Sequence, residues 1–437
     1  EDHDDPRSEM IRISCEQAQY ARGDDPWYDL ENRLRNWFEK NRADWLGRSQ
    51  GIDVDIERGL LQLEINAPHL ASSSLAHKIR NPIREGWVQR LKIASLVEPL
   101  LAEIHNQERI GRVTCLDLTR SYLNREGYEL LAQQPQICEL SLRQSTSPDL
   151  MALKDLPRLQ KLNVSYCYEL QGDGFQALAK EGRLRHLDIS GCPYLNTVIH
   201  SVSHLPELQT LNMGDYLYAG QGLAHLSECH KLRSLTARFG SQVEPTIFHS
   251  LAKLEQLESL QLNLTSPGPL ANLNQITRLA HLHTLHLESY LGSAAELMPL
   301  TNLPQLRELV LTPAFNVSDE VLGLLQRLSS RLERLTMVSG QFTDQVFQAI
   351  QQITGLKVLR LDFCRNLTGA GVDALESLPN LRELSLTYSN IDRGIVSHLC
   401  KLKQLRKLNL WGCYRLPVSH LERIREALPR CEVLGPR

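Results

Sequence analysis

Residues 356–367 read LKVLRLDFCRNL, and two similar stretches follow: LRELSLTYSNI at residues 381–391 and LRKLNLWGCYRL at residues 405–416. Each stretch opens with the pattern L-x-x-L-x-L, in which the last two leucines are separated by one polar residue. Side chains along a β-strand alternate between its two faces, so these two leucines point to one side and the polar residues to the other. The pattern predicts a short strand with one buried and one open face.

The same pattern recurs thirteen times, and successive copies are 22 to 26 residues apart. The copies begin at Val113, Ile137, Leu159, Leu184, Leu208, Leu232, Leu257, Leu282, Leu306, Leu332, Leu356, Leu381 and Leu405. Regular recurrence of this kind is typical of repeat proteins, in which one unit cannot bury its own apolar face but a stack shares a continuous core.

The second half of a copy has a helical spacing of apolar residues. Gly371, Val372, Ala374, Leu375 and Leu378 illustrate it, and the next strand follows soon after. Each repeat is therefore predicted to consist of a strand, a bend, a helix and a return segment. The fold class that follows is α/β, a solenoid with a parallel sheet on one side and helices on the other.

A cysteine stands three residues beyond the last apolar residue of the strand in several copies, namely Cys167, Cys192, Cys364 and Cys413, and Asn390 lies at the bend of another copy. Stretches of the form LxxLxLxxC followed by a helix resemble the leucine-rich-repeat superfamily, in particular its cysteine-containing subclass found in F-box adaptors. The resemblance covers about residues 111–434. It implies a right-handed horseshoe with a concave parallel sheet and a helical convex side. The copies at 208, 232, 257, 282 and 306 lack the cysteine, so we expect less regular convex helices there.

Three regions are expected along the chain. Residues 1–25 are predicted to be an acidic, disordered leader, because low hydrophobicity and high charge oppose folding. Residues 26–110 are predicted to form a small α+β cap of helix, hairpin and helix, and residues 111–437 the repeat domain. The cap pattern rests on a helical spacing, two alternating segments and a second helical spacing: Trp27 to Trp45, Ile52 to Ile56, Leu61 to Ile65, and residues 74–106. The first helix either caps the first repeat or belongs to a separate partner-binding helix pair.

Net charge, hydropathy and cysteine content restrict the classes of function that we expect. The 437 residues carry a net charge of -3, which lacks the broad positive field of many nucleic-acid-binding proteins. No segment approaches the roughly 20 apolar residues that cross a bilayer, so no integral membrane protein is expected. Ten cysteines without a C-x-x-C pair indicate reduced thiols and a cytoplasmic location. The chain begins at Glu1 rather than at a methionine, so the sequence leaves open a natural N-terminus further upstream.

No catalytic or metal-binding motif is recognisable. The sequence contains no phosphate-binding glycine loop, G-x-S-x-G elbow or H-E-x-x-H motif, so we expect no enzyme, cofactor or metal. Two histidine-containing groups could be considered for a metal, namely His281, His283 and His286, and His225, Cys229 and His230. We interpret both as packed or solvated side chains. The recurring bend cysteines are interpreted as structural thiols rather than nucleophiles.

The outward strand positions predict a binding face with a near balance of acidic and basic residues, which suits a protein partner better than a nucleic acid. These positions include Asp117, Glu139, Arg143, Lys161, His186, Asp188, Arg238, His286, Glu288 and Glu308. Tyrosines and tryptophan cluster just past the strands, and such residues are enriched at interface hot spots. The predicted partner-binding patch comprises Arg334, Arg360, Asp362, Phe363, Glu383, Tyr388, Lys407 and Trp411.

Three functional hypotheses remain open at this point. The leading one is a protein-interaction scaffold, for example a bacterial effector or an adaptor that delivers a bound target. The second is a substrate-recognition subunit of a ubiquitin ligase, although residues 26–108 lack a recognisable F-box. The third is a fragment of an enzyme whose catalytic residues lie in the N-terminal quarter.

Overall fold

The computed structural model describes residues 7–17, 19, 25–46, 52–57, 60–66, 88–94, 113–146, 148–218, 222–240, 246–264, 272–290, 294–313, 319–328 and 331–435. These residues fall into two compact units, residues 1–208 and 209–437.

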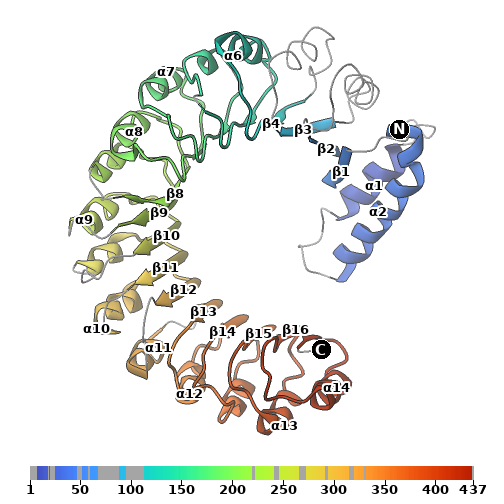
Figure 1. The fold of residues 1–437 in the computed structure, drawn as a ribbon. Coiled ribbons are helices and arrows are strands. Elements are labelled where there is room, and N and C mark those ends of the chain that lie inside the picture. Colours follow the sequence, from blue (N-terminus) through green and yellow to red (C-terminus); the bar gives the residue numbers. More distant parts are fainter. Residues whose placement is uncertain are drawn as a thin grey trace. The chain divides into compact units, whose positions relative to one another are not determined.

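The first unit contains two N-terminal helices followed by strands that alternate with helices (Figure 1). Its elements are α1 (Arg7–Gln17), α2 (Asp25–Leu46), β1 (Ile52–Glu57), β2 (Leu60–Asn66), β3 (Val88–Ala94), β4 (Cys115–Asp117), α6 (Arg125–Ala132), β5 (Glu139–Ser141), η2 (Ala152–Asp155), β6 (Lys161–Asn163), α7 (Asp173–Glu181), β7 (His186–Asp188) and α8 (Leu195–Val202).

Strands β2 to β7 of this unit form one parallel ladder, and β1 pairs antiparallel with β2. The antiparallel pair confirms the hairpin predicted from the alternating segments, with Ile52 opposite Ile65. In the parallel ladder, leucines align from strand to strand at positions 63, 91, 116, 140, 162 and 187. This alignment brings the apolar residue of each repeat onto that of the next and so builds the shared core.

The ladder begins earlier than the thirteen predicted copies. Residues 88–94, placed in a predicted helical segment, instead form strand β3, which pairs with β2 and β4. The helix prediction is therefore wrong there, because Val88, Leu91 and Ile93 repeat the strand pattern with its alternating buried side chains. Leu60, Leu63 and Ile65 show the same spacing. The rest of the predicted second cap helix lies outside the described residues.

Helices α1 and α2 pack on each other. Helix α2 confirms the helix predicted from Pro26 onward, whereas α1 corrects the expectation of disorder for residues 7–17. Met10 and Ile13 of α1 are buried against Leu30 and Leu34 of α2, with Trp37 at the edge. Burial of such side chains contributes about 1.5–3 kcal/mol each, which offsets the polar composition of the segment.

The second unit repeats strand and short helix throughout. Its strands are β8 (Thr210–Tyr218), β9 (Ser234–Phe239), β10 (Ser259–Leu264), β11 (Thr284–Tyr290), β12 (Glu308–Pro313), β13 (Arg334–Val338), β14 (Val358–Asp362), β15 (Glu383–Ser385), β16 (Lys407–Asn409) and β17 (Glu432–Leu434). Its helical segments are η3 (Leu223–Glu228), α9 (Ile247–Leu251), η4 (Leu273–Arg278), α10 (Ala294–Leu297), η5 (Met298–Asn302), η6 (Asp319–Val321), α11 (Leu322–Leu325), α12 (Gln345–Ile350), η7 (Val372–Ser377), η8 (Arg393–Ile395), α13 (Val396–Leu399) and α14 (Val418–Ala427).

All ten strands of the second unit are parallel, and the helical segments cover one side of the sheet (Figure 1). Each of the thirteen predicted copies contains a strand that starts two residues after the predicted beginning, which confirms the repeat. Leu285, Leu335, Leu384 and their equivalents in the thirteen copies are at most 2% exposed. We call the other side of the sheet, whose side chains alternate with these leucines, the open face.

The repeats differ in their strand length and in their helical segments. Strands β9 to β12 have six or seven residues, whereas β15 and β16 have three. The expectation of less regular helices in the middle of the chain is confirmed at η3 and η4, which are 3-10 helices. The α-helix predicted around residues 371–378 is also a 3-10 helix, η7.

Candidate functional site

Four aromatic side chains line the end of strands β14 to β16, and we call them the aromatic ladder: Phe363, Tyr388, Trp411 and Tyr414. The rings of Phe363 and Tyr388 are stacked, with centroids 4.7 Å apart and an interplanar angle of 8°. Trp411 Nε1 donates a hydrogen bond to the Tyr388 hydroxyl over 3.2 Å, and Tyr414 meets the Tyr388 ring edge-on at 6.5 Å. The four side chains are 40–77% exposed, so a large apolar surface is held in one arrangement without being buried.

An unusual backbone conformation places these rings. Phe363 and Tyr388 have φ values of 58° and 54°, in the left-handed region that bulky residues rarely adopt. In this conformation the N–H of Phe363 donates to the carbonyl oxygen of Thr387, and the N–H of Tyr388 to that of Trp411. The chain thus turns out of the sheet at the same point in successive repeats, and the two rings are presented one above the other.

Gly412 completes the arrangement. It occupies the equivalent left-handed position in the next repeat, with φ of 77°, and a Cβ there would lie 2.6 Å from Cδ1 of Tyr388. The missing side chain leaves room for the Tyr388 ring to lie over the Gly412 backbone. The stack therefore depends on a glycine that the sequence pattern alone does not connect with the aromatic residues.

Asp362, one of the predicted contact residues, is engaged by the neighbouring strand. Its Oδ1 accepts hydrogen bonds from the Ser385 hydroxyl at 2.6 Å, the Thr387 hydroxyl at 2.7 Å and the Thr387 N–H at 2.9 Å. Three donors on one oxygen fix the bend before Tyr388. Its observed contacts therefore hold the aromatic ladder in place.

The charged members of the predicted patch lie on strands β13 to β16, and three of them form ion pairs. Arg360 lies 3.5 Å from Glu383, and Lys407 lies 3.7 Å from Glu432, all with exposed or half-exposed side chains. Exposed pairs of this kind contribute about 0–1 kcal/mol and exchange partners readily. Arg334 is exposed on β13, but buried Val358 separates it in register from Glu383.

The first unit also contains an aromatic residue in the left-handed conformation whose ring lies over a glycine of the next repeat. Tyr166 has φ of 57°, and its ring lies over Gly191, where a Cβ would be 2.6 Å from Cδ1. The Arg143 guanidinium carbon lies 4.6 Å from the centre of the Tyr166 ring. Tyr168 and Tyr194 are exposed nearby in sequence. Aromatic residues at the bends are thus a feature of both units, but the stacked rings occur at β14 to β16.

Comparisons with known proteins bear on the fold. A family model described as leucine rich repeat matches residues 354–414. A crystal structure of an internalin (inlF) from Listeria monocytogenes str. 4b F2365 aligns with a TM-score of 0.52 and 19% identity, covering 77% of this chain and 93% of the internalin. The fold is a leucine-rich-repeat solenoid.

A second solved structure, a complex of TLR13 with ssRNA13, aligns with a TM-score of 0.51 and 19% identity. The alignment covers 80% of this chain and 48% of the TLR13 chain. At this level of identity the likeness concerns the solenoid fold alone.

The bend cysteines have a structural role in the solenoid. Cys167, Cys192 and Cys413 donate S–H hydrogen bonds to carbonyl oxygens of the preceding repeat, those of Leu142, Val164 and Leu386, over 3.0–3.2 Å. In a repeat without the cysteine, the Ser389 hydroxyl donates the equivalent hydrogen bond to the carbonyl oxygen of Leu361. Desolvation raises the pKa of Cys167 to about 12 and that of Cys192 and Cys413 to about 11. Protonated, buried thiols of this kind support the structural interpretation over a nucleophilic one.

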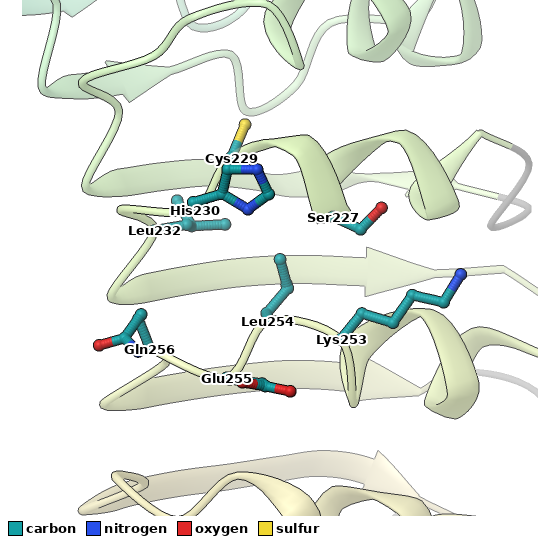
Figure 2. Close-up of a pocket in the computed structure, with 8 residues that line it drawn as sticks. All are labelled: Ser227, Cys229, His230, Leu232, Lys253, Leu254, Glu255 and Gln256. Carbon is teal, nitrogen blue, oxygen red and sulfur yellow. The ribbon is translucent and has the colours of Figure 1, made fainter.

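The predicted histidine groups are not assembled for metal binding. Within the described ranges, no three His, Cys, Asp or Glu side chains are close enough to hold a metal ion. His286 lies instead 3.3 Å from Glu308 on the open face. Cys229 and His230 line a depression of about 340 Å³ on the helical side, together with Ser227, Lys253 and Glu255 (Figure 2). Burial raises the pKa of Cys229 to about 12.

Among the residues that the structure describes, no helix is both long and apolar enough to span a membrane.

Proposed function

We propose that this solenoid is a protein-interaction scaffold and that its partner binds over the aromatic ladder. The single observation that carries the proposal is the stack of Phe363 and Tyr388, hydrogen-bonded to Trp411, on an exposed edge. Tyrosine and tryptophan bury a large area at little entropic cost, and here the rings are already ordered before a partner arrives.

The charges around the ladder favour a protein partner with both acidic and basic groups. Arg360, Glu383 and Lys407 lie on the open face beside the rings, and Arg334 adds a further positive charge on β13. A polar rim around an aromatic centre is typical of protein interfaces. The mixed signs give specificity by complementary charge rather than uniform attraction.

An adaptor in the cytoplasm is the finer form of this proposal. The hydrogen-bonding thiols of Cys167, Cys192 and Cys413 function in the reduced state, which suits a reducing compartment. Their position at the bend also supports the resemblance to the cysteine-containing subclass, and with it the alternative of a ubiquitin-ligase recognition subunit. A bacterial effector would use the same binding edge.

The test is quantitative affinity capture with the full chain. We expect Trp411→Ala and Arg360→Glu to reduce recovery of the specific partners, with a larger loss for Trp411→Ala because hot-spot aromatics contribute about 2 kcal/mol or more. Tyr122→Ala, which removes an exposed tyrosine of the first unit, is the matched control and should leave recovery unchanged.

The outcomes separate the alternatives. Equal recovery by all three variants and the unmodified chain would mean that the aromatic ladder is not the binding edge. Recovery of ligase core components would support the ubiquitin-ligase alternative over a free adaptor. Capture that nuclease treatment abolishes would replace the protein partner with a nucleic acid.

A further inference from the structure

Arg238 is a half-buried arginine of the open face that has no partner among the residues that the structure describes. It lies on β9, where its side chain alternates with the buried Ala237 and Phe239. Its Nε is completely covered and unbonded, and the side chain makes no hydrogen bond or ion pair with any residue that the structure describes. A guanidinium is charged at every physiological pH, so partial burial without a partner lowers the stability of the fold.

The neighbouring strand β8 is irregular opposite Arg238. Met213 of β8 pairs with Ala237, but the next aligned pair is Tyr218 with Phe239, so residues 214–217 of β8 stand opposite Arg238 alone. This is a β-bulge, which interrupts the ladder and removes the in-register neighbour that each strand residue normally has. Gly214, the first residue of the bulge, has no side chain to fill the space.

On the other side of β9, the amide residue Asn263 lies between Arg238 and Glu288, the acidic residue at the same register position of the sheet. Asn263 of β10 aligns with both Arg238 and Glu288 of β11, which places the two charges two strand spacings apart, roughly 10 Å. Glu288 accepts instead from the amides of Gln261 at 2.9 Å and Asn263 at 3.3 Å. The Asn263 Oδ1 is itself covered and unbonded. The acidic residue of the row is therefore committed to amides and does not neutralise the arginine.

The chemistry of the surroundings indicates the ligand. Strands β8 to β12 carry no other lysine or arginine, whereas they carry the acidic Asp215, Glu288 and Glu308. The open face around Arg238 also presents hydroxyl and amide groups such as Thr236, Gln261 and Thr284. One guanidinium among hydrogen-bonding groups matches a carboxylate, which is planar, singly charged and bound by two parallel N–H groups. A phosphate dianion would call for a second cation.

We propose that Arg238 anchors a subsite for the carboxylate of an aspartate or glutamate side chain on the protein partner. The proposal rests on the proposed function in requiring a protein partner, but it concerns strands β8 to β11 rather than the aromatic ladder. The carboxylate supplies a negative charge that no described residue gives to this guanidinium.

The test uses the full chain and a fluorescent peptide in which glutamate alternates with serine, followed by anisotropy at low ionic strength. We expect Arg238→Met to weaken binding of this peptide about tenfold or more, as for loss of a charge-assisted hydrogen bond. Arg233→Met is the matched control, because Arg233 lies just before β9 and is paired with Glu258 at 2.6 Å. It should leave peptide binding unchanged.

Three results would overturn the proposal. These are equal binding by Arg238→Met, equal binding of a peptide with glutamine in place of glutamate, and displacement of the peptide by inorganic phosphate at equal concentration. Trp411→Ala should not weaken binding of the peptide. The peptide assay therefore tests the carboxylate subsite separately from the aromatic ladder.

A second measurement separates a binding role from a structural one. Because Arg238 has no partner in the fold, Arg238→Met should leave the melting temperature unchanged or raise it, whereas Arg233→Met should lower it slightly. A marked fall in the melting temperature for Arg238→Met would show that the arginine supports the fold, and it would contradict the proposal.

Discussion

The repeats at β15 and β16 and those at β9 to β12 end their strands in different ways. At β15 and β16, the chain leaves the sheet at a left-handed residue, Tyr388 or Gly412, and the Ser389 or Cys413 that follows bonds to the preceding repeat. At β9 to β12 the strands continue for six or seven residues. A left-handed residue thus accompanies the bend at β15 and β16, beside which the aromatic rings lie, whereas β9 to β12 run on as longer strands.

The largest effect that this comparison predicts is a loss of stability at alkaline pH in the repeats with bend cysteines. Burial raises the pKa of Cys167 and Cys364 to about 12 and of Cys192 and Cys413 to about 11, from an ordinary value of 9.0. Because the pKa of these thiols is higher in the folded state than in the unfolded state, their contribution to stability is fully present below pH 9. It is lost as the pH rises through 11 to 12. We expect roughly 2 kcal/mol per thiol to be lost by about pH 10.5, measured as the free energy of unfolding in urea.

Replacement of all four cysteines by serine is the control for this pH effect, since serine does not ionise in that range. The variant should lose the part of the alkaline decline that these four thiols cause, whereas Cys229, whose pKa burial also raises to about 12, keeps its contribution. Amide hydrogen exchange at high pH should show faster opening around the bends than in β9 to β12. An equal increase in exchange across both kinds of repeat would contradict the assignment to the thiols.

A smaller effect is expected for Gly412→Ala. The alanine would have to keep the left-handed backbone conformation of Gly412, and its Cβ would lie against the Tyr388 ring. We therefore expect about 1–3 kcal/mol of destabilisation and a changed near-ultraviolet circular dichroism signal. Gly323→Ala, at a helical glycine with no atom within 4 Å of the added Cβ, should be neutral or slightly stabilising. If the two variants behaved alike, Gly412 would not be what holds the aromatic ladder.

The smallest effect concerns the hydrogen bond of a single bend thiol. Cys413→Ala removes the donor to the Leu386 carbonyl and should destabilise the chain by about 1 kcal/mol. Cys413→Ser should recover most of this loss, because Ser389 makes the equivalent bond one repeat earlier. Urea unfolding of the two variants at neutral pH provides the comparison, and a serine variant as unstable as the alanine variant would argue against the hydrogen bond.

The sequence predicted the strands well because their signal is local. All thirteen L-x-x-L-x-L copies became strands, since alternating burial is encoded within six residues. The copies at Leu60 and Val88 were missed, although LLQLEI and VQRLKI carry the same signal, because their 28-residue separation lies outside the period found elsewhere. The parallel pairing of β2 with β3 is a contact between distant residues, and alternation alone does not reveal it.

The candidate site was less predictable for a physical reason. The position of Trp411 after its strand indicated an exposed side chain, and the aromatic residues were recognised as a cluster. Their stacking depends on left-handed backbone at Phe363 and Tyr388 and on space over Gly412, which arises only when successive repeats are superposed. The isolation of Arg238 likewise follows from a bulge in β8 that no strand pattern announces.

The matching bends at Phe363 and Tyr388 also make the protein modular for engineering. Both residues have the same backbone conformation, and each donates its N–H to the next repeat. A chain lacking residues 364–388 would join Phe363 directly to Ser389 with the geometry of an existing junction. Such a shortened protein should fold with one turn of the coil removed, and insertion of a duplicate of the same segment should lengthen it by one.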